Sequence, residues 1–354
     1  DCLNSNGHRV TVPAASGAVV RCATVSATRR LIPGLVLAIL TGFLGMDLAA
    51  FDWTIYWFMF PVSIVIATTA MLSGIGGAAM FAPIFMIIFP ILGPDYPFPS
   101  IAAAIGVALF TETFGFSSGF VGYFRKRLID FKSALPFIAV GVPIGIVGAL
   151  LLTSFKEYEE VLRGGYAILM LTLSVELIRH HNPVQDMHLD GAEAESAGAA
   201  SVANLRPMRS ITGRDGTTYD FRAPRQGKGA IATGIGGFLT GLLGVGIGEV
   251  VMPQLVKRNH VPVAVAAATS VFVVIVVVAA ASFTQISALV AEGGLQAVPW
   301  NAVIYTVPAV IIGGQIGPRL QGTVSQRAME RSIGYLFLVI GLAMGFIAIR
   351  NTFF

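Results

Sequence analysis

Two stretches of the chain follow one pattern: GIGGAAMFAP at residues 74–83 and GVGIGEVVMP at residues 244–253. Each is a glycine cluster with a proline nine residues after its first glycine, and each interrupts an apolar run. Glycine weakens a helix and lets the backbone come close to a ligand. A glycine break inside an apolar run therefore indicates a broken membrane helix, which is tolerated only where it lines a cavity. Matching breaks in two halves of a membrane chain are typical of a transporter's binding site.

The composition predicts an all-α polytopic membrane protein. Of the 354 residues, 55% are hydrophobic and only 12% are charged, whereas a soluble domain carries about a quarter charged residues. The net charge of +4 is explained by basic residues in loops that face the cytoplasm. We therefore expect a lipid bilayer around the chain and no nucleic-acid partner.

The polar segments divide the chain into five parts. Residues 1–30 form a polar N-terminal segment ending in Arg29-Arg30, and no cleavable signal peptide is expected before the first apolar segment. Hydrophobic periodicity vanishes in 179–228, which predicts a soluble linker of mixed charge. The remaining parts are apolar: a first transmembrane helix at 31–53, a first repeat at 54–178 and a second repeat at 229–350, each repeat with a broken hairpin and three spans.

The two repeats share more than the glycine clusters. Two triplets keep one spacing of 17 residues, namely Phe131, Gly148, Gly165 and Trp300, Gly317, Gly334. Tyr166 likewise matches Tyr335. Several landmarks at one spacing indicate an internal duplication.

The positive-inside rule decides how the broken stretches cross the membrane. If each stretch is a hairpin turning at its glycines, the N-terminus, the 179–228 linker and the main basic loops are cytoplasmic. The short arm 249–256 has eight residues, about 12 Å of helix at about 1.5 Å per residue. That length cannot cross a hydrocarbon core of about 30 Å. We therefore predict two inverted repeats whose glycine-broken hairpins meet near mid-membrane.

The hairpin tips are predicted to bind a small anion. The arms starting at Ala78 and Glu249 would present helix N-termini, whose free N–H groups and partial positive charge favour anions. Pro83 and Pro253 inside these arms would kink them and free a carbonyl. Tight helix packing is the alternative role for the glycines. The predicted substrate-binding residues are Gly74, Gly76, Gly77, Ala78, Gly244, Gly246, Gly248 and Glu249.

Two acidic residues in apolar surroundings are candidates for proton coupling or a gate. Ionisable residues inside a membrane are costly, so Glu112 and Glu249 are functional candidates. Glu249 can alternatively serve as a helix cap. Four polar residues could line a path or hydrogen-bond between helices: Thr269, Ser270, Gln254 and Gln315.

The motifs resemble a known family. GFLTGLLGVGIGEVVMP at 237–253 resembles the repeated motif of the TauE/SafE sulfite exporters, also called TSUP, and the stretch from Ser73 to Pro83 resembles its first copy. The chain departs from that motif where Ile247 interrupts the glycines and where Glu249 places a carboxylate. The resemblance implies a secondary transporter of the cytoplasmic (inner) membrane for sulfite, thiosulfate, sulfoacetate or related sulfonates. It implies no ATP, and the sequence has no phosphate-binding loop.

Two other function classes compete with a transporter of sulfur anions. A carrier or channel for another small organic anion is the alternative within transport. A membrane-embedded hydrolase would need a buried histidine or an HExxH motif; none of the five histidines lies in the middle of an apolar run, and the motif is absent. The expected protein is therefore not an enzyme and needs no cofactor or metal.

Overall fold

The computed structural model describes most of the chain after residue 50: residues 51–73, 76–154, 159–179, 207–224, 227–320 and 326–353. In a separate unit, Asp1–Ala50, it describes only β1 (Cys2–Leu3) and β2 (Arg9–Val10), which pair as antiparallel strands. Outside the described residues lie the rest of the predicted 1–30 segment, nearly all of the predicted helix 31–53, Gly74, and much of the 179–228 linker.

Long apolar helices dominate the described chain and confirm the all-α polytopic class. Six of those described are long and apolar enough to cross a membrane. They are α5 (Ile101–Arg125), α6 (Phe131–Ser154), α7 (Glu159–Arg179), α11 (Val263–Gly293), α12 (Trp300–Leu320) and α13 (Gln326–Phe353). Caps set their ends: Ser100 Oγ accepts the Ala103 N–H of α5 at 3.1 Å, and Gly294, at φ +69°, ends α11.

Both glycine stretches break a helix. In the first half α2 (Met59–Ser73) ends before the glycines and α3 (Ala78–Pro83) follows them. In the second half α9 (Gly227–Leu243) and α10 (Ile247–Pro253) take these places, so the second arm begins two residues before the expected Glu249. The arms then continue through π-helical stretches, η2 (Ile84–Ile88) with α4 (Phe89–Leu92), and η5 (Gln254–Arg258).

Proline explains the two π-helical stretches. Pro83 and Pro253 each lie at the last position before the wider helix starts. Because proline lacks an N–H and its ring clashes with the carbonyl four residues earlier, the regular ladder is interrupted there. The two halves accommodate this in the same way, by a π-helical stretch of five residues.

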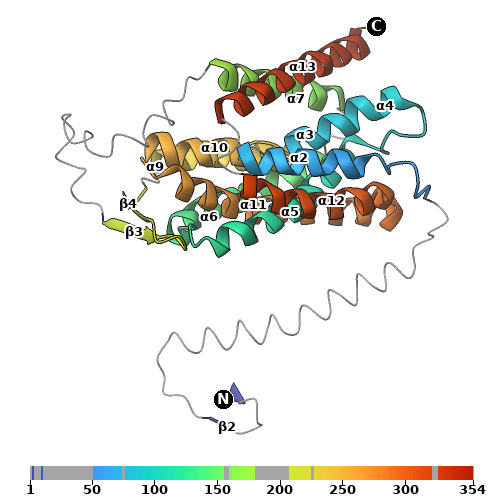
Figure 1. Ribbon diagram of the computed structural model, residues 1–354. Coiled ribbons are helices and arrows are strands. Elements are labelled where there is room, and N and C mark those ends of the chain that lie inside the picture. The colour runs from blue at the N-terminus through green and yellow to red at the C-terminus, as the bar shows by residue number, and fades with distance from the viewer. Residues whose placement is uncertain are drawn as a thin grey trace. The chain divides into compact units, whose positions relative to one another are not determined.

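The helix contacts repeat when each helix is replaced by its counterpart in the other half. Helix α2 packs on α12 as α9 packs on α6, and α5 packs on α12 as α11 packs on α6. The pairs α5 with α11 and α7 with α13 map onto themselves, and Figure 1 shows α7 and α13 side by side. This pairing is the one that an internal duplication predicts. The inversion of the repeats relative to a membrane stays a prediction.

Glycines outside the tips bring helix backbones together. A Cβ on Gly237 of α9 would stand 2.8 Å from the Gly141 carbonyl oxygen of α6. A Cβ on Gly313 of α12 would stand 2.6 Å from the Ile64 carbonyl oxygen of α2. These distances leave no room for a side chain, so the glycines allow the close helix approach known from membrane bundles.

The linker between the repeats contains a β-hairpin that periodicity did not reveal. Strands β3 (Met208–Thr212) and β4 (Thr218–Arg222) pair in antiparallel register. Gly216, at φ +82°, supplies the turn, and Asp215 Oδ1 accepts the Thr217 N–H at 3.2 Å. The 179–228 segment is therefore not irregular throughout.

Candidate functional site

The tips of the two broken hairpins lie in contact. A Cβ on Gly244 would be 3.7 Å from the Cβ of Ala78 and 3.3 Å from Ile105 of α5. Gly244 and Gly246 have φ values of +79° and +142°, which side chains rarely adopt. Glycine is therefore required by the turn of the second tip as well as by its close approach to the first.

Backbone N–H groups of the first tip bind two carboxylates. The Gly76 N–H donates to Glu249 Oε1 at 3.1 Å, and the Gly77 N–H donates to Glu112 Oε1 at 2.9 Å. The Ala78 N–H also interacts with the Glu112 carboxylate. Glu112 comes from the middle of α5 and is only 3% exposed. The first tip is thus an oxyanion-binding site whose present oxyanions are side chains.

Glu249 joins the two tips. Its Oε1 accepts the Gly76 N–H of the first tip, and its Oε2 accepts the Gly246 N–H of the second tip at 3.1 Å. The second tip is also held by Thr240, whose Oγ1 accepts the Ile247 N–H at 2.8 Å. Glu249 is therefore a helix cap, as one reading of the sequence predicted, and at the same time a bridge between the repeats.

The two carboxylates lie beside each other. From the position that a Cβ on Gly76 would occupy, Glu112 Oε1 is 3.0 Å away and Glu249 Oε1 is 3.4 Å away. A side chain at this position would force the Glu112 carboxylate to shift. A cavity of about 10 Å³, whose lining includes Gly77, Glu112 and Gly115, lies beside Glu112. It is about large enough for one water, so a larger anion needs a side chain to move.

Tyr166 contacts the first short arm in a way that the sequence did not reveal. Its hydroxyl donates to the Ala79 carbonyl at 3.1 Å, and its side chain is 1% exposed. Pro83 cannot donate to that carbonyl, four residues before it, so Tyr166 of α7 satisfies a carbonyl that proline frees. The sequence predicted the freed carbonyl. It did not predict that Tyr166 would be its partner, because Tyr166 drew notice only through its match with Tyr335.

Three of the four predicted path residues form hydrogen bonds away from the glycine tips. Thr269 Oγ1 accepts the Asp130 N–H at 3.0 Å, Gln315 Nε2 donates to the Ser118 carbonyl at 2.6 Å, and Gln254 Nε2 donates to Thr233 Oγ1 at 3.4 Å. The buried Ser270 Oγ has no hydrogen-bond partner within the described part of the chain. Gly248 is buried in α10, and Gly74 lies outside the described residues. Their part in transport stays a prediction.

The structure has candidate membrane spans and two broken hairpins that touch at their tips. This combination is the architecture of a membrane transporter. The family comparison agrees: the model described as "Sulfite exporter TauE/SafE" matches residues 58–344, and the chain belongs to this family. The family resemblance expected from the tip motifs is thereby confirmed. In the described residues, no three His, Cys, Asp or Glu side chains form a group suited to a metal ion.

Two curated relatives are similar over most of their length. Probable membrane transporter protein YunE of Bacillus subtilis (strain 168) is 23% identical over 282 residues, which cover 79% of this chain and 93% of the relative. Probable membrane transporter protein MJ0441 of Methanocaldococcus jannaschii is 23% identical over 292 residues, covering 80% and 92% respectively. No solved structure matches the chain.

Proposed function

We propose that this protein is a secondary transporter that moves a small sulfur-containing anion across the cytoplasmic membrane. The substrate class is sulfite, thiosulfate, sulfoacetate or a related sulfonate. One observation carries the proposal: N–H groups of Gly76, Gly77 and Gly246 from two touching tips all donate to carboxylate oxygens. A sulfite or sulfonate group offers the same kind of acceptor oxygens, and the family description names sulfite export.

The carboxylates give the transporter a means of proton coupling. An anion that takes the tip N–H groups must displace Glu112 or Glu249, and a remaining carboxylate would repel it. A proton on the displaced carboxyl group removes that repulsion. Proton binding at this pair therefore accompanies anion binding in our proposal. The other titratable group near both acids is Tyr166 from α7.

The bridge made by Glu249 links binding to alternating access. In the structure one carboxylate accepts N–H groups from both hairpin tips. When a substrate replaces that carboxylate, the hydrogen-bonded link between the two tips is lost, which in our proposal allows one repeat to rock against the other. The small size of the cavity beside Glu112 favours such a carrier over an open channel.

A carrier for another small organic anion is the second candidate. The tips hold carboxylates in the structure, so an organic carboxylate satisfies the same N–H groups as a sulfonate. The choice between the two classes depends on the shape of the occupied site, and a comparison of matched anions decides it.

Thermal unfolding of the purified protein in detergent tests the proposal. The anions are sulfite, thiosulfate, sulfate, sulfoacetate, taurine and acetate, each at pH 6 and pH 8. A ligand that binds the folded state raises the melting temperature. We expect a sulfur anion to stabilise the wild type more at pH 6. Glu112→Gln and Glu249→Gln should reduce this pH difference, because a permanently neutral side chain needs no proton.

Two controls make the outcomes separable. Glu176→Gln changes an exposed carboxylate of α7 and should respond like the wild type. Gly76→Ala places a methyl group beside both acids without backbone strain and should weaken anion stabilisation. Stabilisation by acetate alone would favour the organic-anion carrier. No effect of any anion on folded wild type would contradict the tip site, and an effect independent of pH would contradict proton coupling only.

A further inference from the structure

A second pocket lies at the basic end of α5, remote from the hairpin tips. It has a volume of about 600 Å³ and is lined by Phe124, Arg125, Arg127, Ile129, Phe131 and Arg214. Glu112 is 13 residues from Arg125 along α5, which corresponds to about 20 Å of helix. The pocket is thus separate from the proposed substrate site.

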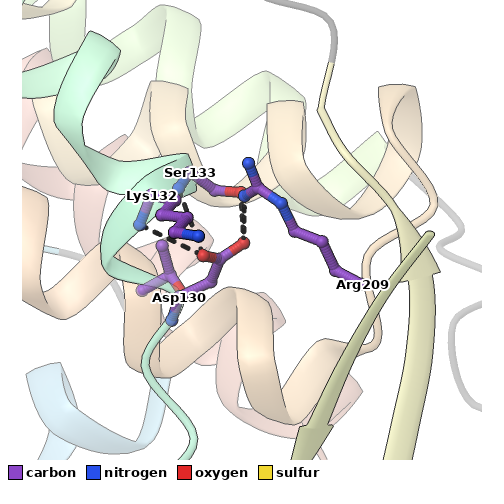
Figure 2. Close-up of polar contacts among 5 residues, drawn as sticks. Asp130, Lys132, Ser133 and Arg209 are labelled. Carbon is purple, nitrogen blue, oxygen red and sulfur yellow. Dashed lines mark hydrogen bonds and ion pairs between the residues drawn. The ribbon is translucent and has the colours of Figure 1, made fainter. Parts of the chain in front are cut away.

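The linker hairpin completes this pocket. The Arg214 N–H donates to the Lys126 carbonyl at 3.1 Å, which docks the hairpin turn on the loop after α5. Figure 2 shows the second attachment, where Arg209 extends from the hairpin to Asp130 and Ser133 at the start of α6. Arg209 Nη1 lies 2.7 Å from both Asp130 Oδ2 and Ser133 Oγ. Arg209 therefore positions Arg214 without lining the pocket.

The arginines of the pocket are available to an anion. In the part of the chain that the structure describes, Arg125, Arg127 and Arg214 are exposed and their side chains form no ion pair or hydrogen bond. The nearby Asp130 is paired with Arg209. Three guanidinium groups around one pocket suit a phosphate group, whose oxygens accept several N–H donors at once.

The backbone at Arg127 adds support. Its φ is +58°, a left-handed conformation that residues other than glycine seldom adopt. Glycine would fit this turn better than arginine. An arginine at such a position suggests that its side chain has a use there.

Two exposed phenylalanine side chains in the lining of this pocket are suited to contact with lipid. Phe124 and Phe131 are 55% and 46% exposed. They also belong to a ring cluster, because Phe131 stacks edge-on with Phe272 at 5.0 Å and Phe124 lies 5.7 Å from Phe120. Phenylalanine rings exposed at the end of a span offer apolar surface to acyl chains. A free phosphate would use only the arginines, whereas a lipid uses both the arginines and the rings.

We propose that this pocket binds the phosphate group of an anionic phospholipid, with the acyl chains against Phe124 and Phe131. Arginine clusters at the cytoplasmic ends of membrane helices are suited to anionic headgroups. The bound lipid would hold the linker hairpin against the membrane end of α5. The inference is independent of which substrate the tips carry.

The test measures lipid binding to delipidated full-length protein by native mass spectrometry and thermal unfolding. The probes are phosphatidylglycerol, phosphatidylcholine and inorganic phosphate. We expect phosphatidylglycerol to bind the wild type at least fivefold more tightly than phosphatidylcholine. Arg127→Gly should weaken phosphatidylglycerol binding at least fivefold while keeping the melting temperature of the lipid-free protein, because glycine suits φ +58°.

Further variants separate the roles. Arg209→Ala should weaken binding by releasing the hairpin, and Arg319→Ala, a basic residue at the end of α12 outside the pocket lining, should not. Phe124→Ala should weaken phosphatidylglycerol binding and leave the binding of inorganic phosphate unchanged. Equal binding of phosphatidylglycerol to wild type and Arg127→Gly would overturn the site. Stabilisation by inorganic phosphate as strong as by phosphatidylglycerol would overturn the lipid assignment.

Discussion

The two hairpin tips share a backbone plan but differ in the origin of their acids. Both have a glycine break, a short helix and a π-helical stretch after a proline. The second tip carries its own acid, Glu249, which caps the Gly246 N–H. The first tip has Ala79 at the corresponding place, 170 residues earlier. Its N–H groups donate to Glu112 from α5 and to Oε1 of Glu249, the oxygen that does not accept the Gly246 N–H.

This difference makes the junction of the two tips asymmetric. Each tip supplies its own N–H donors, and a single acid in the second tip is enough to join them. Because Glu249 accepts from both tips, the hydrogen-bonded link between the tips depends on one side chain that can be protonated. A symmetric pair of acids would have capped each tip separately and left the halves without this tie.

The largest expected effect contrasts the glycines of the two tips. Gly246 has φ +142°, and a Cβ there would be 2.9 Å from the Gly236 carbonyl oxygen. Backbone strain and overpacking together should make Gly246→Ala lower the free energy of unfolding by about 4 kcal/mol. Gly76 has a φ outside the left-handed region, and its Cβ would meet the movable Glu112 side chain at 3.0 Å, so Gly76→Ala should cost about 1 kcal/mol.

Thermal unfolding in detergent, followed by tryptophan fluorescence, measures both glycine variants. The expected difference between the two tips is contradicted if Gly76→Ala destabilises the protein as much as Gly246→Ala. Gly234→Ala, whose Cβ would meet the Ile144 side chain at 3.0 Å, provides a control for a crowded glycine away from the tips.

The next largest effect distinguishes the structural roles of Glu249 and Glu112. Glu249→Ala leaves N–H groups of both tips without acceptors, and each buried unsatisfied N–H costs about 1–3 kcal/mol. We expect a loss of about 2–4 kcal/mol, with faster hydrogen exchange in both 74–83 and 244–253. Glu112→Ala should speed exchange in 74–83 only. Equal acceleration of both stretches by Glu112→Ala would show that the bridge does not depend on Glu249.

The sequence predicted the fold better than the chemistry of the site. Glycine clusters, spans and proline positions are local patterns, so the broken hairpins and six described spans follow from them. The family followed from the same residues. Glu112 and Glu249 were recognised as costly acids, but their contacts depend on how α5 and two distant tips meet in three dimensions, which spacing does not reveal.

Other features were beyond the sequence for a similar reason. The β3–β4 hairpin is short and gains its place through Arg209 and Arg214, which contact loops from another part of the chain. Gln254 and Gln315 were predicted to line a path or to hydrogen-bond between helices; their amide groups form interhelical hydrogen bonds, and their place on a path stays a prediction. A polar residue in a span has several partners within reach, and only packing decides which one it uses.

The smallest effect compares two matched tyrosines. Tyr166 is buried and donates to the Ala79 carbonyl that Pro83 leaves without its helical partner, whereas Tyr335 at the corresponding place in α13 is 58% exposed. Tyr166→Phe should therefore lower the free energy of unfolding by about 1 kcal/mol, the value of one hydrogen bond, and Tyr335→Phe should leave it unchanged. Both are measured by thermal unfolding. A stable Tyr166→Phe would mean that water serves this carbonyl equally well, so that the first arm does not depend on α7 for support.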